Sequence, residues 1–136
     1  MAGLGDIIGK YTSLCDWKLG RIINGEYYCD YIVDMVRNSI HLCINHIEGI
    51  KNREELAIKY LVEGLIITGI AMSFSGNSRP ASGSEHHLAH FWEMMFIFDS
   101  KEAVLHGRKV GVTEIVIVKL YELLTEVNFD YEKAIR

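Results

Sequence analysis

Proline is almost absent from this chain, which has one proline and seven tyrosines among 136 residues. With 49% hydrophobic residues, such a composition is not typical of a disordered protein. The formal net charge of −4 provides no excess of Lys and Arg for binding a nucleic-acid backbone. The N-terminus also lacks the basic start and apolar run of a signal peptide. We therefore expect one cytoplasmic globular domain over residues 1–136, with neither nucleic acid nor a membrane as partner.

Cysteine is also scarce, with Cys15, Cys29 and Cys43 as the three residues and no CxxC pair. An odd number of cysteines in so short a chain favours reduced thiols over a disulfide framework. Reduced cysteines commonly behave as small apolar residues, so we expect most of them in the core.

Strand signals are missing, because no segment alternates polar and apolar residues between hairpin turns. Apolar residues recur instead at helical spacing, interrupted at Gly20 and at Asn24-Gly25. The pattern predicts an all-α, multi-helix fold. Helices are expected at about residues 4–17, 26–47, 54–74 and 85–98, and from residue 100 past residues 106–107 into 113–127.

The most apolar stretch, residues 61–74, contains Glu63 and falls short of the length that a membrane-spanning helix needs. We interpret it as a buried core helix. A small-residue loop, residues 75–84, follows it, and Ser82 or Ser84 is expected to cap the next helix, with Glu85 in the first turn.

Four of the six histidines cluster between residues 86 and 106: His86, His87, His90 and His106. His86 and His90 are four positions apart and share a helix face. His106 is followed by Gly107, whose missing side chain lets a backbone or a ligand approach. One imidazole from each of two helices, joined by a carboxylate, forms the open three-ligand site that a catalytic divalent metal requires.

Asp6, within Gly3-Leu-Gly-Asp-Ile-Ile-Gly9, is the candidate carboxylate. Simpler interpretations stay open at this point: Asp6 as a helix N-cap, His86 and His90 as a partly buried polar pair, and Arg79 as a surface ion pair. Three histidines are interpreted as structural, and a group of four aromatic residues is expected to serve packing. They are His41, His46 and His87, and Phe91, Trp92, Phe96 and Phe98.

Three motifs together resemble a known family. The segment Ser78-Arg-Pro-Ala-Ser-Gly-Ser-Glu-His-His-Leu-Ala-His-Phe-Trp-Glu93 resembles the core motif of the sn-glycerol-1-phosphate dehydrogenases, in particular the bacterial AraM-type enzymes. Gly3-Leu-Gly-Asp6 and Leu105-His-Gly107 resemble two further motifs of that family, in the same order. The family is similar to iron-containing alcohol dehydrogenases and dehydroquinate synthases. The resemblance implies the helical C-terminal domain of that class, which follows a Rossmann-like nucleotide-binding domain.

The resemblance also implies roles for individual residues. Asp6, His86 and His106 would be the metal ligands, and His90 would assist proton transfer. Arg79 and Ser82 would lie where a phosphorylated substrate enters, an assignment that rests on charge and proximity. The metal would be zinc, nickel or iron, and the whole enzyme would use NAD or NADP.

No strand-rich nucleotide-binding domain and no glycine-rich turn after a strand occurs in this sequence. We therefore expect a truncated, inactive part of an enzyme that reduces dihydroxyacetone phosphate to glycerol 1-phosphate, with the nucleotide-binding domain and a second copy of the chain as partners. Two alternatives remain. One is a domain of a glycerol dehydrogenase or dehydroquinate synthase-like enzyme, and the other is a catalytically dead helical module that binds a partner through exposed apolar surface.

Overall fold

A computed structural model describes residues 1–127 of the chain, and every regular element in that range is a helix. The predicted all-α, multi-helix fold is therefore confirmed. In chain order the helices are α1 (Ala2–Ile8), α2 (Lys10–Asn24), α3 (Asp30–Asn45), α4 (Ile47–Lys51), α5 (Glu55–Ser75), α6 (Ser84–Phe98) and α7 (His106–Thr125).

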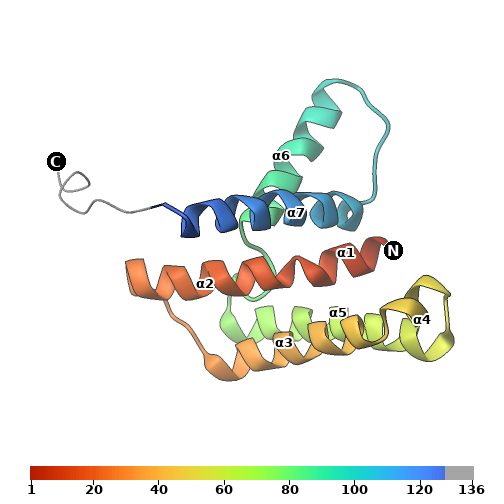
Figure 1. Cartoon of the computed structure of the whole chain (residues 1–136), viewed down its shortest axis with the longest axis horizontal. Coiled ribbons are helices and arrows are strands. Elements are labelled where there is room, and N and C mark those ends of the chain that lie inside the picture. Colours follow the sequence, from red (N-terminus) through yellow and green to blue (C-terminus); the bar gives the residue numbers. More distant parts are fainter. Residues whose placement is uncertain (128–136) are drawn as a thin grey trace.

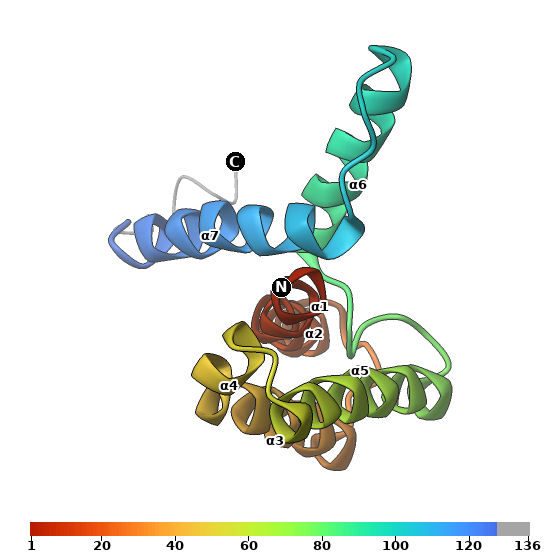
Figure 2. The same cartoon turned by 90° about the vertical axis from the view of Figure 1, so that its right-hand side faces the viewer.

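The helices form three layers, with α1 and α2 in the middle (Figure 1). Helices α3, α4 and α5 cover one side of this central pair, and α7 with the base of α6 covers the other (Figures 1 and 2). Two apolar clusters fill the space between the middle layer and the α3–α5 layer. Trp17 and Val36 are fully buried in one, and Ile7 and Cys43 in the other. These two clusters therefore join α1 and α2 to the α3–α5 layer.

The observed helix ends differ from the predicted ones where glycine was overinterpreted. The first predicted helix, residues 4–17, is divided at Gly9 into α1 and α2, and α2 continues through Gly20 as far as Asn24, because a lone helical glycine is tolerated at a modest cost. Gly25 ends α2 in the left-handed region, with φ of 68°. Residues predicted as a connection form the short helix α4. In the other direction, α7 begins at His106, so residues 100–105 are not helical as predicted.

Neither Ser82 nor Ser84 caps α6, since Gly83 occupies the N-cap position. The free amides at this helix start are satisfied by carboxylates instead. The Gly83 amide donates to Oε1 of Glu85 at 3.0 Å, and the Ser84 amide donates to Oδ2 of Asp16 at 2.6 Å. Glu85 is thereby fixed in the first turn, directly before His86.

Helix α5 is less buried than the sequence suggested. It is long and apolar enough to cross a membrane, judged by length and composition alone, and 28% of its most apolar window is buried within the chain. Ala57, Leu61 and Ala71 pack inward, whereas Ile66 is 57% exposed and Phe74 is 63% exposed. Residues 61–74 were interpreted as a buried core helix too short to span a membrane, whereas the helix that contains them is longer than this stretch and only partly buried.

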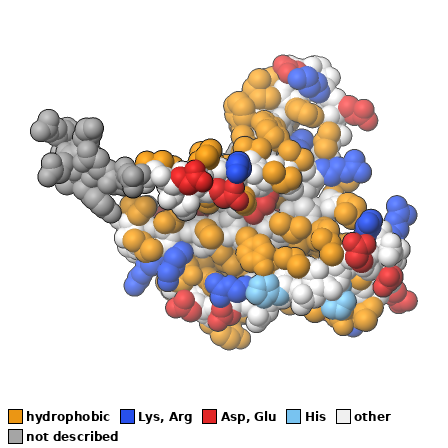
Figure 3. Space-filling view, viewed as in Figure 1, with side chains coloured by type: hydrophobic (Ala, Val, Ile, Leu, Met, Phe, Trp, Pro, Cys, Tyr) orange, Lys and Arg blue, Asp and Glu red, His pale blue; other side chains and the backbone are white. Residues whose placement is uncertain are grey.

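The outer half of α6 projects from the layered body (Figure 2). Phe91 and Phe98 on this half are exposed, so the prediction that the aromatic residues of α6 serve packing was wrong for these two. Hydrophobic side chains are spread over the face seen in Figure 3 as well. Of the three free cysteines, only Cys43 is buried, whereas Cys15 is exposed. The described part of the chain thus presents considerable apolar surface.

Candidate metal centre

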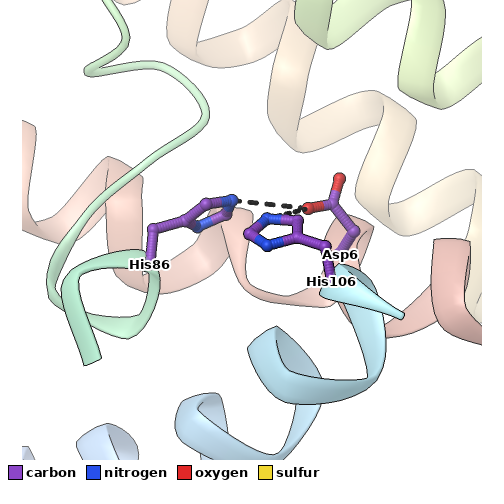
Figure 4. A group of neighbouring side chains, drawn as sticks. All are labelled: Asp6, His86 and His106. Atoms are coloured by element: carbon purple, nitrogen blue, oxygen red, sulfur yellow. Dashed lines mark ion pairs between the residues drawn. The ribbon is translucent and has the colours of Figure 1, made fainter. Parts of the chain in front are cut away.

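Asp6, His86 and His106 come together from three helices, α1, α6 and α7 (Figure 4). Nε2 of His86 lies 3.4 Å from Oδ1 of Asp6, and Nε2 of His106 lies 3.8 Å from the same oxygen. One ligand atom of each residue lies within 4.8 Å of those of the other two. The structure therefore brings together the three residues that the sequence suggested as metal ligands.

Glycines allow this approach, because α1 and α7 cross with their backbones in contact. A Cβ placed on Gly107 would lie 2.1 Å from the carbonyl oxygen of Ala2, and one on Gly5 would lie 2.2 Å from the carbonyl oxygen of Gly107. The prediction that Gly107 lets a backbone come close is therefore confirmed. Asp6 and His106 each lie next to one of these glycines, so the crossing sets their separation.

Carboxylates hold both imidazoles from behind. Nδ1 of His86 lies 2.6 Å from Oε1 of Glu85, which is fully buried, and Nδ1 of His106 lies 2.9 Å from Oε1 of Glu93. An ionised carboxylate only accepts hydrogen bonds, so each Nδ1 donates and each Nε2 is left for the side of Asp6. The sequence analysis gave neither glutamate a role beside the histidines, although Glu85 directly precedes His86 and Glu93 follows His90 by three positions on a helical pattern.

The electrostatics of the trio favour an anionic Asp6. Burial alone would raise the pKa of Asp6, but the hydrogen bond to His86 and the charge of Lys10 outweigh it and lower that pKa to about 2. Burial alone would lower the pKa of His86, but the hydrogen bonds to Asp6 and Glu85 raise it above its ordinary value. Without an ion, the Lys10 ammonium thus balances the carboxylate, and the raised pKa of His86 favours the charged form of its imidazole.

Lys10 is a further residue to which the sequence analysis gave no role. Its ammonium lies 2.9 Å from Oδ2 of Asp6, and its side chain is 4% exposed. The signal was present, since Asp6 and Lys10 are four positions apart on a helical pattern. The site therefore contains a buried positive charge in addition to its histidines.

A cleft of about 430 Å³ opens onto Asp6 and His86 of the trio. His90 and Ser82, two of the residues predicted from the sequence, line it beside Lys10 and His86. The ring centroid of His90 lies 5.1 Å from that of His106 and 6.1 Å from that of His86. The structure thus places His90 and Ser82 next to the three candidate ligands.

Arg79 lies elsewhere. Its guanidinium donates to Oε1 of Glu26 at 2.6 Å, and it lines a separate pocket of about 250 Å³ together with Asp16 and His87. Its predicted role as a phosphate ligand is not supported by this position, because the cleft at the trio is lined by Lys10 instead.

The trio fits a tetrahedral divalent metal. With metal–ligand bonds of about 2.0–2.1 Å, the ligand atoms of a tetrahedral site lie about 3.3 Å apart. The 3.4 Å and 3.8 Å separations from Asp6 are close to that distance, and the donor set of two imidazoles and one carboxylate is typical of catalytic sites. Three protein ligands leave a position for a water molecule or a substrate oxygen.

Comparison with known proteins relates the chain to one family. It is 43% identical to a protein of Geobacillus stearothermophilus over 89% of its own length, and 37% identical to one of Methanosarcina mazei over 88%. It is also 38% identical to a protein of Bacillus subtilis over 92% of its length. Each is named glycerol-1-phosphate dehydrogenase [NAD(P)+].

The chain spans about a third of the length of these relatives, between 30% and 33%. No family model matches the chain. The resemblance recognised in the sequence motifs is nevertheless confirmed: the chain is homologous to one segment of the glycerol-1-phosphate dehydrogenases.

Proposed function

We propose that this chain is the metal-binding part of an NAD(P)-dependent glycerol-1-phosphate dehydrogenase. The observation that carries the proposal is the convergence of Asp6, His86 and His106 in a chain whose relatives bear that name. The proposal includes the reduction of dihydroxyacetone phosphate to glycerol 1-phosphate as the reaction of the whole enzyme. A nucleotide-binding domain is proposed to supply most of the contacts to the dinucleotide.

The three ligands would hold zinc, nickel or iron(II), and a bound ion of this kind polarises a ketone and stabilises the negative charge that hydride transfer creates. The chain's own residues perform the remaining tasks. His90 exchanges a proton with the substrate at the edge of the cleft. The Lys10 ammonium, beside Ser82 in that cleft, provides positive charge for a phosphorylated substrate.

The exposed apolar surface supports a partner for this chain. Ile66 and Phe74 on α5 and Ile115 on α7 are each more than half exposed. Apolar patches of this kind commonly mark interfaces with another domain or subunit. They are compatible with the proposal of a nucleotide-binding domain as partner. They are also compatible with the alternative of a catalytically dead interaction module, in which the three candidate ligands would have no catalytic role.

Metal content and affinity of the purified chain separate these functions. Elemental analysis and calorimetric titration with zinc and nickel should find one ion per chain, bound more weakly than in a whole enzyme. Asp6→Ala and His86→Ala should each abolish binding. His87→Ala is the matched control, since this exposed neighbour lies in the other pocket and should leave binding unchanged. Absence of binding by the folded chain would refute the self-contained metal site.

An activity assay of the chain alone, with dihydroxyacetone phosphate and NADH or NADPH, should give no turnover. Turnover by the chain alone would contradict the proposal that another domain holds the dinucleotide. Activity of a reconstituted enzyme with glycerol but not with a phosphorylated substrate would favour the alternative of a glycerol dehydrogenase.

A further inference from the structure

Glu93 contacts two different histidines, one with each of its carboxylate oxygens. Oε1 lies 2.9 Å from Nδ1 of His106, and Oε2 lies 2.9 Å from Nδ1 of His90. His106 is a candidate metal ligand, and His90 is the candidate proton donor of the same cleft. Glu93 itself is not among the residues that line this cleft.

The chemistry of these contacts determines which ring nitrogens carry hydrogen. The Lys109 ammonium lies 3.8 Å from Oε1 of Glu93, and a glutamate beside a positive charge is ionised at neutral pH. An ionised carboxylate has no hydrogen to donate, so both Nδ1 atoms must donate to it. In the neutral rings, Nε2 of His106 and Nε2 of His90 then carry lone pairs.

We propose that Glu93 is a positioning residue that holds His106 and His90 in the Nδ1–H form at the same time. For His106 this form directs a lone pair at Nε2 toward Asp6, as a metal ligand requires. For His90 it leaves Nε2 as the nitrogen that exchanges a proton with a ligand in the cleft. One side chain thereby couples the geometry of metal binding to that of proton transfer, an inference that rests on the proposed function.

A second arrangement is possible for the same residues, because ligand atoms of His90, Glu93 and His106 also lie within 4.8 Å of one another. The distances argue against an ion between them. Ligand atoms around a tetrahedral ion lie about 3.3 Å apart. The two 2.9 Å separations between Glu93 and the histidines instead match ordinary hydrogen bonds.

The tautomers can be measured directly in the metal-free chain by long-range ¹H–¹⁵N NMR of the histidine rings, at a pH of about 8.5 where most imidazoles are neutral. The proposal expects the Nδ1–H form for both His90 and His106. Exposed histidines such as His87 are the internal reference, since a neutral, solvated histidine side chain favours the Nε2–H form. The Nε2–H form at both His90 and His106 in the wild-type chain would overturn the proposal.

Glu93→Gln tests the same point with nearly unchanged shape. A glutamine has one acceptor oxygen, so one of the two Nδ1–H groups must face an NH₂ group and lose its acceptor. At least one ring should change tautomer, and the affinity for zinc should fall about 10–100-fold. Glu122→Gln, which removes an exposed partner of Lys119, is the matched control and should change neither. Unchanged tautomers and zinc affinity in Glu93→Gln would overturn the proposal.

Failure of this inference is distinguishable from failure of the proposed function. If the wild-type chain has both Nδ1–H tautomers but binds no zinc, the positioning role stands and the metal site fails. If two zinc ions bind per chain and Glu93→Gln removes one of them, Glu93 is a metal ligand and the positioning role is overturned.

Discussion

Replacing Gly107 with alanine should loosen the crossing of α1 and α7 and with it the metal centre. The new Cβ would lie 2.1 Å from the carbonyl oxygen and 2.7 Å from the carbonyl carbon of Ala2, whereas ordinary contacts begin at 3.4 Å. These are backbone atoms that cannot rotate away, so the two helices must move apart by about 1 Å in a close-packed region. Since Asp6 lies on one helix and His106 on the other, their separation of 3.8 Å should increase.

Overpacking of this kind costs about 1–3 kcal/mol, and the higher helix propensity of alanine offsets at most about 1 kcal/mol of it. We expect the free energy of unfolding to fall by about 1–2 kcal/mol and the melting temperature by about 3–10 °C. Zinc affinity should fall as well. Thermal and urea denaturation followed by circular dichroism, with calorimetric zinc titration, measure both effects.

Gly69→Ala is the matched control, because no atom lies within 4 Å of a Cβ at that helical position. It should stabilise the chain by about 0.5–1 kcal/mol through helix propensity and lower unfolded-state entropy. If Gly107→Ala were as stable as the wild type and bound zinc equally well, the crossing would not control the site.

Two other predictions concern buried charge. Burial outweighs the opposing hydrogen bond from Thr12 and, together with the charges of Glu85 and Asp16, raises the pKa of Glu114 from 4.5 to about 7. The stability that the protonated carboxyl contributes is therefore present below pH 4.5 and lost as the pH rises toward 7. Glu114→Gln should be about 1–3 kcal/mol more stable than the wild type at pH 8 but nearly equal to it at pH 4. Equal urea midpoints of the two proteins at pH 8 would refute this. Lys10→Met removes the ammonium that pairs with Asp6 in the absence of metal. The metal-free variant should be less stable by about 1–3 kcal/mol, yet bind zinc more tightly because no cation competes for the carboxylate; weaker zinc binding in calorimetry would contradict the competition.

The helical fold was predictable because apolar spacing alone distinguishes helices from strands. Histidine spacing and the glycine-flanked Asp6 suggested the candidate ligands, and the family motifs strengthened the assignment, since spacing by itself could not join Asp6 to residues a hundred positions away. Helix ends were predicted less well, because Gly20 was taken for a helix breaker although its neighbours sustain the helix. The roles of the site residues remain predictions.

What the sequence could not reveal depends on tertiary partners. Arg79 was assigned by its charge and its closeness to the histidines along the chain, but the fold gives it Glu26 as a partner. Lys10 and Glu93 went unnoticed because a Lys or a Glu on a helix is usually solvated. Their roles become visible only when the fold shows which side chains lie beside them. The exposure of α5 and the tip of α6 likewise depends on surfaces that no periodicity describes.

The contact between α1 and α7 has a consequence for the order in which the chain assembles. Asp6 and His106 lie near opposite ends of the described sequence, so we expect their contact, which is non-local, to form late in folding. An ion bound by both would close a loop of about a hundred residues, and a covalent link across such a loop is worth about 4–5 kcal/mol in the chain-entropy picture. Metal release should then allow α1 and α7 to separate locally. Hydrogen exchange of the backbone amides of α1 and α7 should become faster, while the amides of α3 and α5 remain protected.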